Sequence, residues 1–270
     1  MKTIRQPVVR ILAISIFLLV LYMVSKILYI GYYIYSRNLL VGDSIMNFSY
    51  IFKEIFYDGD YDRGYDLNNS VVFDVGANMG LFSLWINDKF SNMKVHCFEP
   101  LPVLYKICEH NLKSNERSNN KFYVHNIGLS NKDEIITMNY FPNANGLSTA
   151  TNDMDDKSNK LKDGYSYIVK KGTEKSIAVN VKMMLAKKFI IENNIQHIDF
   201  CKIDVEGFEL AVVEGFGDFV NIVDVFIIEV ENYRKDNLKK ILDHLENFDL
   251  SILNEQANWC IITARRKRSS

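Results

Sequence analysis

Apolar and polar residues follow one another in regular blocks from residue 70 onward, and the spacing within each block predicts an element. Short apolar runs predict buried strands, and apolar residues three or four positions apart predict the helices that cover them. The predicted strands are 71–75, 94–98, 121–125, 197–205 and 223–230, and the predicted helices are 80–90, 101–114, 208–215 and 234–247. Alternating strands and helices of this kind are typical of a doubly wound α/β sheet.

The end and the middle of this region depart from the alternation. Two short apolar runs, 250–254 and 259–264, are joined by a turn and predict an antiparallel pair. Between residues 126 and 196, "EIITMNYF" and "SIAVNVKM" have the character of strands, and the long polar stretch that separates them predicts a loop. We therefore expect a mostly parallel sheet with an antiparallel strand near the C-terminus.

The N-terminal segment is strongly apolar, and Lys26 is its only charged residue between Ile11 and Ser36. The uncharged run before Lys26 is shorter than the roughly 20 residues that span a bilayer, but it is long enough when it continues to about Tyr33. We expect a transmembrane helix that makes residues 1–36 a membrane anchor. A cleaved signal peptide and a helix packed on the domain are the alternatives.

Charge is unevenly distributed along the chain. The formal net charge is −1, which gives no sign of nucleic-acid binding, yet the first 40 residues carry five basic residues and no acidic ones. Lys2, Arg5 and Arg10 precede the apolar run and only Arg37 follows it, so the positive-inside rule places the N-terminus in the cytosol. We expect the rest of the chain on the luminal or extracytoplasmic side.

Two parts are expected after the anchor: a connector of residues 37–69, with a helix around 44–56, and a domain of residues 70–270. The four cysteines lie in apolar runs or in a helical segment, and no pair has the spacing of metal ligands. We expect buried free thiols and no metal site.

The first predicted strand runs directly into a glycine-rich turn in "VVFDVGANMG", and a helix follows. A strand, a glycine turn and a helix are typical of a nucleotide site, because glycine lets the chain pass close to a ligand. This turn lacks the middle glycine of the pyrophosphate-binding motif Gly-x-Gly-x-x-Gly, and Asp74 precedes it. A carboxylate there would repel a pyrophosphate and would suit a cationic ligand.

Glu99 lies 23 residues after Gly76, near the spacing at which an acidic residue binds ribose hydroxyls in dinucleotide sites. S-adenosylmethionine combines an adenosine with a sulfonium and an α-ammonium group, and it has no phosphate. We therefore predict S-adenosylmethionine as the cofactor.

Carboxylates recur at the ends of four predicted strands, where ligands of open α/β sheets bind. They are Asp74, Glu99, Asp204 and Glu206 of "KIDVEGFE", and Glu229 and Glu231 of "IIEVEN". We expect these side chains to converge on one cleft.

Three separated segments, "VVFDVGANMGLFSLW", "VHCFEP" and "IDFCKIDVEGFELAVVEGF", resemble the FkbM-type methyltransferases, over roughly residues 70–265. The resemblance implies an S-adenosylmethionine-dependent O-methyltransferase with the seven-strand class I fold. It also implies a role for each matching position. Asp74, Gly76, Asn78 and Gly80 would form the cofactor turn, Glu99 would hold the ribose, Asn126 to Gly128 would lie near the adenine, and Asp204 and Glu206 would lie beside the methionine end and the transferred methyl.

Two positions depart from the family pattern on the side of the acceptor. A Thr-Leu-Asp element of the family is replaced by residues 183–186, which have no acid, and Glu231 stands where the family often has His. These departures bear on the identity of the acceptor more than on the cofactor.

The expected reaction is an in-line attack by an acceptor hydroxyl on the sulfonium methyl, with a carboxylate that accepts the proton. Asp204 or Glu206 would serve, assisted by Glu229 or Glu231; we assign Asp204 to positioning of the cofactor or methyl and Glu206 to acceptor contact. The acceptor is predicted to be a hydroxyl of a sugar or glycan, with a lipid or small molecule as the alternative. Two other classes stay open: a glycosyltransferase that uses Asp153 and Asp155 of an Asp-x-Asp motif, and a non-catalytic nucleoside-binding domain.

Overall fold

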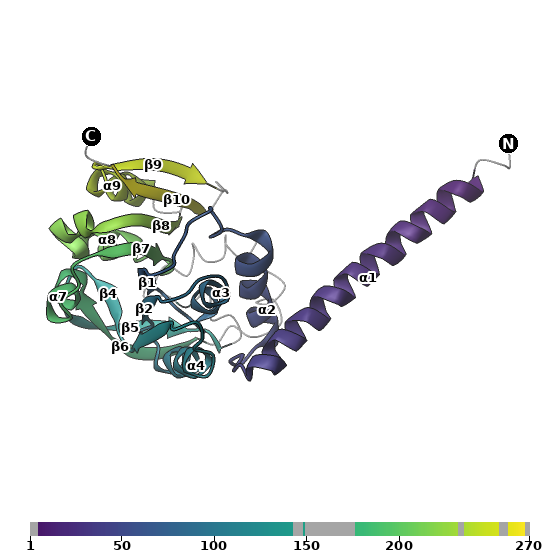
Figure 1. The fold of residues 1–270 in the computed structure, drawn as a ribbon, viewed down its shortest axis with the longest axis horizontal. Coiled ribbons are helices and arrows are strands. Elements are labelled where there is room, and N and C mark those ends of the chain that lie inside the picture. The colour runs from purple at the N-terminus through teal and green to yellow at the C-terminus, as the bar shows by residue number, and fades with distance from the viewer. Residues whose placement is uncertain (1–4, 143–147, 149–175, 232–234, 254–258, 268–270) are drawn as a thin grey trace. The chain divides into compact units, whose positions relative to one another are not determined.

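The computed structural model describes residues 5–142, 148, 176–231, 235–253 and 259–267 (Figure 1). Its contacts divide the chain into two compact units, Met1–Leu39 and Leu40–Ser270. Most of the segment expected as a connector is therefore part of the second unit.

The first unit contains one helix, α1 (Arg5–Arg37). Its stretch Ser15–Arg37 has 23 residues, and the most apolar window within it has a mean hydropathy of 1.8 and no buried positions. Apolar residues lie all around this helix, in contrast to the one-sided stripe of a helix that packs on a globular core. By length and composition this helix can cross a bilayer.

The second unit is built on a seven-stranded sheet of order β3-β2-β1-β7-β8-β10-β9. In this sheet β3, β2, β1, β7 and β8 pair in parallel, and β10 is antiparallel to both β8 and β9. The expected mostly parallel sheet with an antiparallel C-terminal strand is thus confirmed. The strands are β1 (Val71–Val75), β2 (Lys94–Phe98), β3 (Lys121–His125), β7 (Ile198–Ile203), β8 (Val223–Glu231), β9 (Phe248–Leu253) and β10 (Trp259–Arg266).

Helices cover both faces of the sheet (Figure 1). One group contains α2 (Ile45–Lys53), a π-helical turn (Glu54–Asp58), α3 (Leu81–Lys89) and α4 (Pro102–Lys113). The other contains α7 (Ala186–Glu192), α8 (Glu209–Phe216) and α9 (Lys235–His244), with a 3₁₀ helix (Gly217–Ile222) after α8.

Residues alternate between the two faces along each strand, and this alternation decides where the polar side chains of the strands lie. Phe73 and Val75 of β1 belong to the hydrophobic core that α7, α8 and α9 cover. Asp74 therefore points to the opposite face, toward α3, where Ser83 binds it. Its register partner on β7 is Lys202, which lies on the same face.

A second, three-stranded sheet has the order β4-β6-β5. Two of its strands, β5 (Glu134–Tyr140) and β6 (Ile177–Leu185), confirm the strand prediction for "EIITMNYF" and "SIAVNVKM". The third, β4 (Gly128–Ser130), has only three residues and was not predicted. Gly215 of α8 lies so close to β4 that an added Cβ would be 2.0 Å from the Ser130 carbonyl oxygen.

The four cysteines are free and buried, as their apolar surroundings predicted. Burial raises the pKa of the Cys201 thiol, which keeps it protonated.

Candidate active site

A cavity of about 180 Å³ lies at the carboxyl ends of the parallel strands. Segments that follow β1, β2 and β7 line it, together with Glu229 of β8, Trp259 of β10 and residues between Tyr50 and Tyr61. The ends of several strands therefore converge on one cavity, as predicted. An additional wall is formed by residues that precede the first strand in the sequence.

The turn after β1 is held in a conformation that only glycine adopts easily. Gly76 has φ +82°, and an added Cβ would lie 1.8 Å from the Asp204 carbonyl oxygen. Its N–H donates to the carbonyl oxygen of Phe98 at 3.0 Å, which fixes the turn on β2. Gly80 has φ +83° and starts α3. Both glycines are needed for the backbone, and Gly76 also lines the cavity.

Asn78 and Glu99 line the cavity and are joined to each other. The Asn78 N–H donates to Glu99 Oε2 at 2.9 Å, and the Leu101 N–H donates to Oε1 at 2.9 Å. The Asn78 side-chain oxygen Oδ1 is buried and has no hydrogen-bond partner in the structure. Because a buried polar atom without a partner is costly, this oxygen points to a ligand donor in the cavity.

Burial raises the pKa of Glu99 to about 8, although the two backbone N–H groups act in the opposite direction. Glu99 is 5% exposed. A neutral or hydrogen-bonded carboxyl at this position suits the hydroxyls of a ribose.

Asp74 does not line the cavity, where its carboxylate was expected to face a cationic ligand, and its direct contact with the cofactor stays a prediction. The side chain is fully buried. Oδ2 accepts from the Ser83 hydroxyl at 2.7 Å, and Oδ1 lies 3.3 Å from Lys202 Nζ. The strand alternation explains the difference, because it turns Asp74 toward α3 and away from the strand end.

Lys202 is a site residue that the sequence analysis missed. Its buried ammonium donates to the Gly76 carbonyl oxygen at 2.9 Å and pairs with Asp74 and, at 3.4 Å, with Asp204. Burial opposes its charge, but the carboxylates of Asp204 and Asp74 outweigh this effect and raise the Lys202 pKa. The available signal was a lysine inside the apolar strand "FCKIDV", because buried charges are paired.

Asp204 and Glu206 both line the cavity, as predicted. The Asp204 side chain is 31% exposed and is bound to Lys202. Glu206 has φ +54°, a left-handed conformation that costs a non-glycine residue about 1 kcal/mol or more. The following turn is fixed by Gly207, whose N–H donates to Glu209 Oε1 at 2.7 Å. A strained acidic residue at the edge of a cavity is a functional candidate.

The second wall of the cavity is a segment that we call the acidic wall: Tyr50, Glu54, Asp60 and Tyr61. Sequence analysis did not foresee it, because its position depends on tertiary packing alone. The buried Tyr61 hydroxyl makes long hydrogen bonds of 3.5 Å to Asp204 and 3.4 Å to Glu229. Burial and these two carboxylates raise the Tyr61 pKa, so the phenol stays a donor.

Two residues expected near the adenine are not part of the cavity lining. The Asn126 side-chain amide donates to the carbonyl oxygens of Glu99 and Pro100, each at 3.0 Å. Gly128 packs against Met183, whose side chain would lie 2.7 Å from an added Cβ. Asn126 therefore supports the loop after β2, and a position of both residues near the adenine stays a prediction.

Three further predicted residues have no place in this geometry. The side chain of Glu231 is outside the described part, and Asp153 and Asp155 lie outside the described residues altogether. Within the described part, Lys202 is the one basic residue that lines the cavity.

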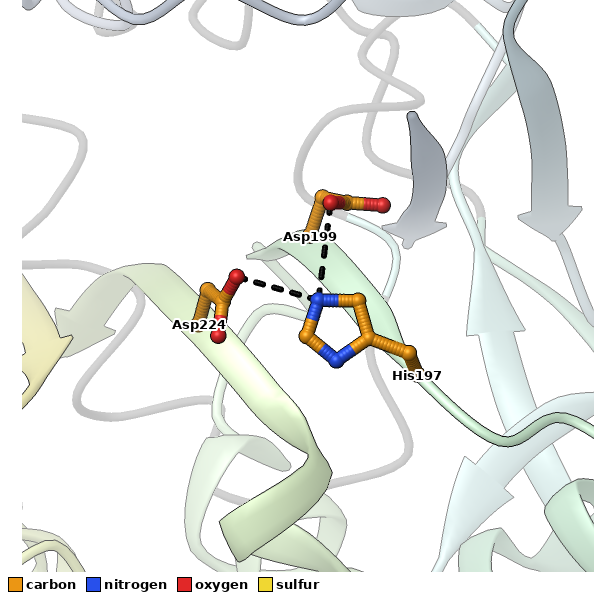
Figure 2. A group of neighbouring side chains, drawn as sticks. All are labelled: His197, Asp199 and Asp224. Atoms are coloured by element: carbon orange, nitrogen blue, oxygen red, sulfur yellow. Dashed lines mark hydrogen bonds and ion pairs between the residues drawn. The ribbon is translucent and has the colours of Figure 1, made fainter. Parts of the chain in front are cut away.

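A group of side chains of metal-ligand type lies at the opposite ends of the strands (Figure 2). His197 Nε2 is 3.0 Å from Asp224 Oδ2 and 3.5 Å from Asp199 Oδ1. The second oxygen of each carboxylate is bound elsewhere, by the Val71 N–H at 2.7 Å and by Arg266. These contacts join β1, β7, β8 and β10, and none of these residues lines the cavity.

The comparisons with known proteins identify the family of the chain. The family model described as the methyltransferase FkbM domain matches residues 74–252. Methyltransferase sdnD of Sordaria araneosa is 30% identical over 239 residues, which cover 81% of this chain and 90% of that protein. The 31-O-demethyl-FK506 methyltransferase FkbM of Streptomyces tacrolimicus is 29% identical over 192 residues, which cover 63% and 68%.

Solved structures include TrmK of M. capricolum in complex with S-adenosyl-homocysteine. It has 12% sequence identity and a TM-score of 0.44, and the match covers 79% of this chain and 69% of TrmK. The family match, in contrast, extends over well over half of the chain and includes the glycine turn, Glu99 and the "KIDVEG" segment. The chain therefore belongs to the FkbM methyltransferase family and is an S-adenosylmethionine-dependent methyltransferase.

Proposed function

We propose that the protein is a membrane-anchored O-methyltransferase that methylates a hydroxyl of a sugar or glycan. The observation that carries this proposal is the cavity itself, which joins the glycine turn and Glu99 on one side to a group of carboxylates and aromatic rings on the other. With the family established, the glycosyltransferase and the non-catalytic alternatives are set aside.

The residues of the turn fit S-adenosylmethionine. The buried, unpartnered oxygen of Asn78 offers an acceptor to a ligand N–H or O–H, and Glu99 offers its carboxyl to the ribose hydroxyls. Gly76 lets the chain pass close to the ligand, and Lys202 holds this turn against β7. When bound, S-adenosylmethionine supplies a methyl group on a positively charged sulfur that leaves as a neutral thioether.

The carboxylates of the cavity receive the proton that the acceptor hydroxyl loses as its oxygen bonds to the methyl carbon. Asp204 is bound to Lys202 and Tyr61, which favours a positioning role at the methionine end. Glu206 stands in a strained turn at the same cavity, and we assign it to the acceptor hydroxyl. Glu229, held by Tyr61, is the second candidate for the base.

The acceptor class rests on the lining and on the family. Trp259 and Tyr50 offer flat apolar faces to a sugar ring, and the carboxylates offer acceptors to its hydroxyls. The name of the Streptomyces relative refers to O-methylation, which supports an oxygen acceptor. A lipid or small-molecule hydroxyl is the alternative.

The anchor and its orientation are part of the proposal. Helix α1 is long and apolar enough to span a bilayer, and the basic residues before it favour a cytosolic N-terminus. The methyltransferase unit would then act in the lumen or outside the cell.

The test is transfer of a labelled methyl group from S-adenosylmethionine by the full chain in detergent, against a panel of oligosaccharides, lipids and small alcohols. We expect a base-stable methyl ether on a sugar. Glu206→Gln should lower kcat at least 100-fold and leave the affinity for S-adenosylhomocysteine unchanged. A methylated lipid as the only product would contradict the acceptor class, and a methylated thiol or amine would contradict the O-methyltransferase assignment.

A further inference from the structure

The acceptor side of the cavity is built largely from residues outside the segment that matches the family. The family match begins at residue 74. The acidic wall, Tyr50, Glu54, Asp60 and Tyr61, comes from α2, the π-helical turn and the loop that follows it. A π-helical turn is rare and often marks a functional position. The feature that distinguishes acceptors is therefore expected in this wall.

The wall is held rigidly against the catalytic carboxylates. Phe48 and Phe52 on the inner side of α2 are fully buried. Tyr61 is 5% exposed, packs edge-on against Phe82 with ring centroids 5.3 Å apart, and binds Asp204 and Glu229. A wall fixed in this way can select ligands by charge without rearrangement.

The charge of the cavity is strongly one-sided. Its described lining contains six carboxyl groups and one basic residue, Lys202, whose charge is shared with the buried Asp74. The six are Glu54, Asp60, Glu99, Asp204, Glu206 and Glu229. With Glu54 and Glu99 mainly protonated at neutral pH, the other four carboxyl groups still outnumber the net charge of about +1 that S-adenosylmethionine carries, so the cavity stays negative when this cofactor is bound.

The surroundings of Glu54 show the same excess of negative charge. Partial burial raises its pKa to about 8, a bond to Tyr50 opposes this, and the charges of Asp204, Asp60 and Glu206 raise it further. An additional positive charge near Glu54 would relieve this repulsion, and an anionic group would increase it.

We propose that the acidic wall selects an acceptor that carries a protonated amine beside the hydroxyl to be methylated, such as an amino sugar, and excludes acceptors with carboxylate, sulfate or phosphate groups. This inference rests on the proposed O-methyltransferase function. It assigns to Glu54 and Asp60 the selection for a positively charged substrate.

The test compares three acceptors of similar size: an oligomer of glucosamine, its N-acetylated form and an oligomer of galacturonic acid. Initial rates are measured with the full chain in detergent. We expect kcat/KM to be at least tenfold higher for the amine than for the N-acetylated form, with the acidic oligomer unreactive. Glu54→Gln and Asp60→Asn should raise KM for the amine about tenfold and should reduce the ratio of kcat/KM between the amine and the N-acetylated form.

The control is Glu192→Gln, which removes an exposed carboxylate of α7 far from the lining and should change neither value. Equal kcat/KM for the amine and the N-acetylated form would overturn the inference and leave the proposed function intact. No transfer to any of the three, while S-adenosylhomocysteine still binds in calorimetry, would overturn the sugar acceptor and the inference together.

Discussion

The residues that build this site divide into those that face the ligand and those that hold them. The buried Lys202 pairs with the buried Asp74 and with the partly exposed Asp204, and these contacts tie β1 to β7 beside the glycine turn. Only Lys202 and Asp204 reach the cavity. Asp74 affects the cavity through these two residues. Its substitution is therefore expected to change the stability of the fold before it changes ligand binding.

Lys202→Met should destabilise the protein by about 3–5 kcal/mol, because it leaves the Asp74 carboxylate buried and uncompensated. The double variant Asp74→Asn with Lys202→Met should recover most of this loss. Lys188→Met is a matched control, since Lys188 pairs with Asp133 at the surface, where solvent screens the pair, and its loss should leave the unfolding midpoint almost unchanged. The measurement is urea unfolding, and equal midpoints for Lys202→Met and Lys188→Met would contradict the buried pair.

The two carboxyl groups with a pKa of about 8, Glu54 and Glu99, predict how cofactor binding depends on pH. Each is raised by burial, so each is mainly protonated below pH 8 and charged above it. A sulfonium binds better to the charged form, so affinity for S-adenosylmethionine relative to S-adenosylhomocysteine should rise from pH 6 to 9.

Glu54→Gln should reduce this slope, while Glu99 retains part of it. The groups around Glu54 are Tyr50, Asp204, Asp60 and Glu206, and those around Glu99 are the Asn78 and Leu101 N–H groups, Lys202 and Asp74. Calorimetry at each pH gives the affinity ratio, in which ionisations that both ligands share cancel. A ratio that stays constant or falls with pH would refute the assigned charges.

Among the elements, the long apolar strands were predictable and the short or packed ones were not. The first three strands begin and end where the sequence places them; β1 and β2 are buried parallel strands, which have nearly continuous apolar runs. β4 was not predicted, because three residues are too few to show a hydrophobic periodicity. α7 was also missed, since its seven residues offer little more than two helical turns.

The site itself was predictable only in part. Gly76, Asn78, Glu99, Asp204 and Glu206 line the cavity as the motifs predicted. The acidic wall could not be foreseen, because no motif marks it and its contact with Asp204 spans more than 140 residues of sequence. Asn126 and Gly128 follow a strand that ends at the site, but the Asn126 side chain binds the neighbouring loop and Gly128 packs against Met183.

Gly76→Ala tests the turn as an element. The added Cβ would have to displace the end of β7, so we expect a loss of about 3 kcal/mol or more and at least a 100-fold weaker affinity for S-adenosylhomocysteine. Gly64→Ala is the control, with a similar φ of +69° and nothing within 4 Å of the new Cβ, and it should cost only about 1–2 kcal/mol. Equal losses of stability and unchanged cofactor affinity would show that the close approach to Asp204 is unimportant.

At the scale of the whole molecule, the chain consists of an apolar helix and a methyltransferase unit. The two are separate compact units that meet in sequence at Leu39, so removal of residues 1–39 should leave the second unit folded.

Full-length protein should stay in the membrane pellet after alkaline carbonate extraction, whereas residues 40–270 should be found in the supernatant and still bind S-adenosylhomocysteine. The apolar helix carries the difference, because about 20 apolar residues partition stably into a bilayer. Immunoblots of both fractions give the result. Release of the full-length protein by carbonate would exclude an integral anchor.

The proposed function requires that S-adenosylmethionine bind in the cavity at the ends of β1, β2 and β7. A crystal structure of the protein in complex with S-adenosylhomocysteine tests this most directly. We predict ribose hydroxyls at Glu99, a ligand donor at the Asn78 oxygen and the sulfur on the side of Asp204 and Glu206. A nucleoside bound outside this cavity, with Glu99 and Asn78 making the same contacts as before, would contradict the central claim.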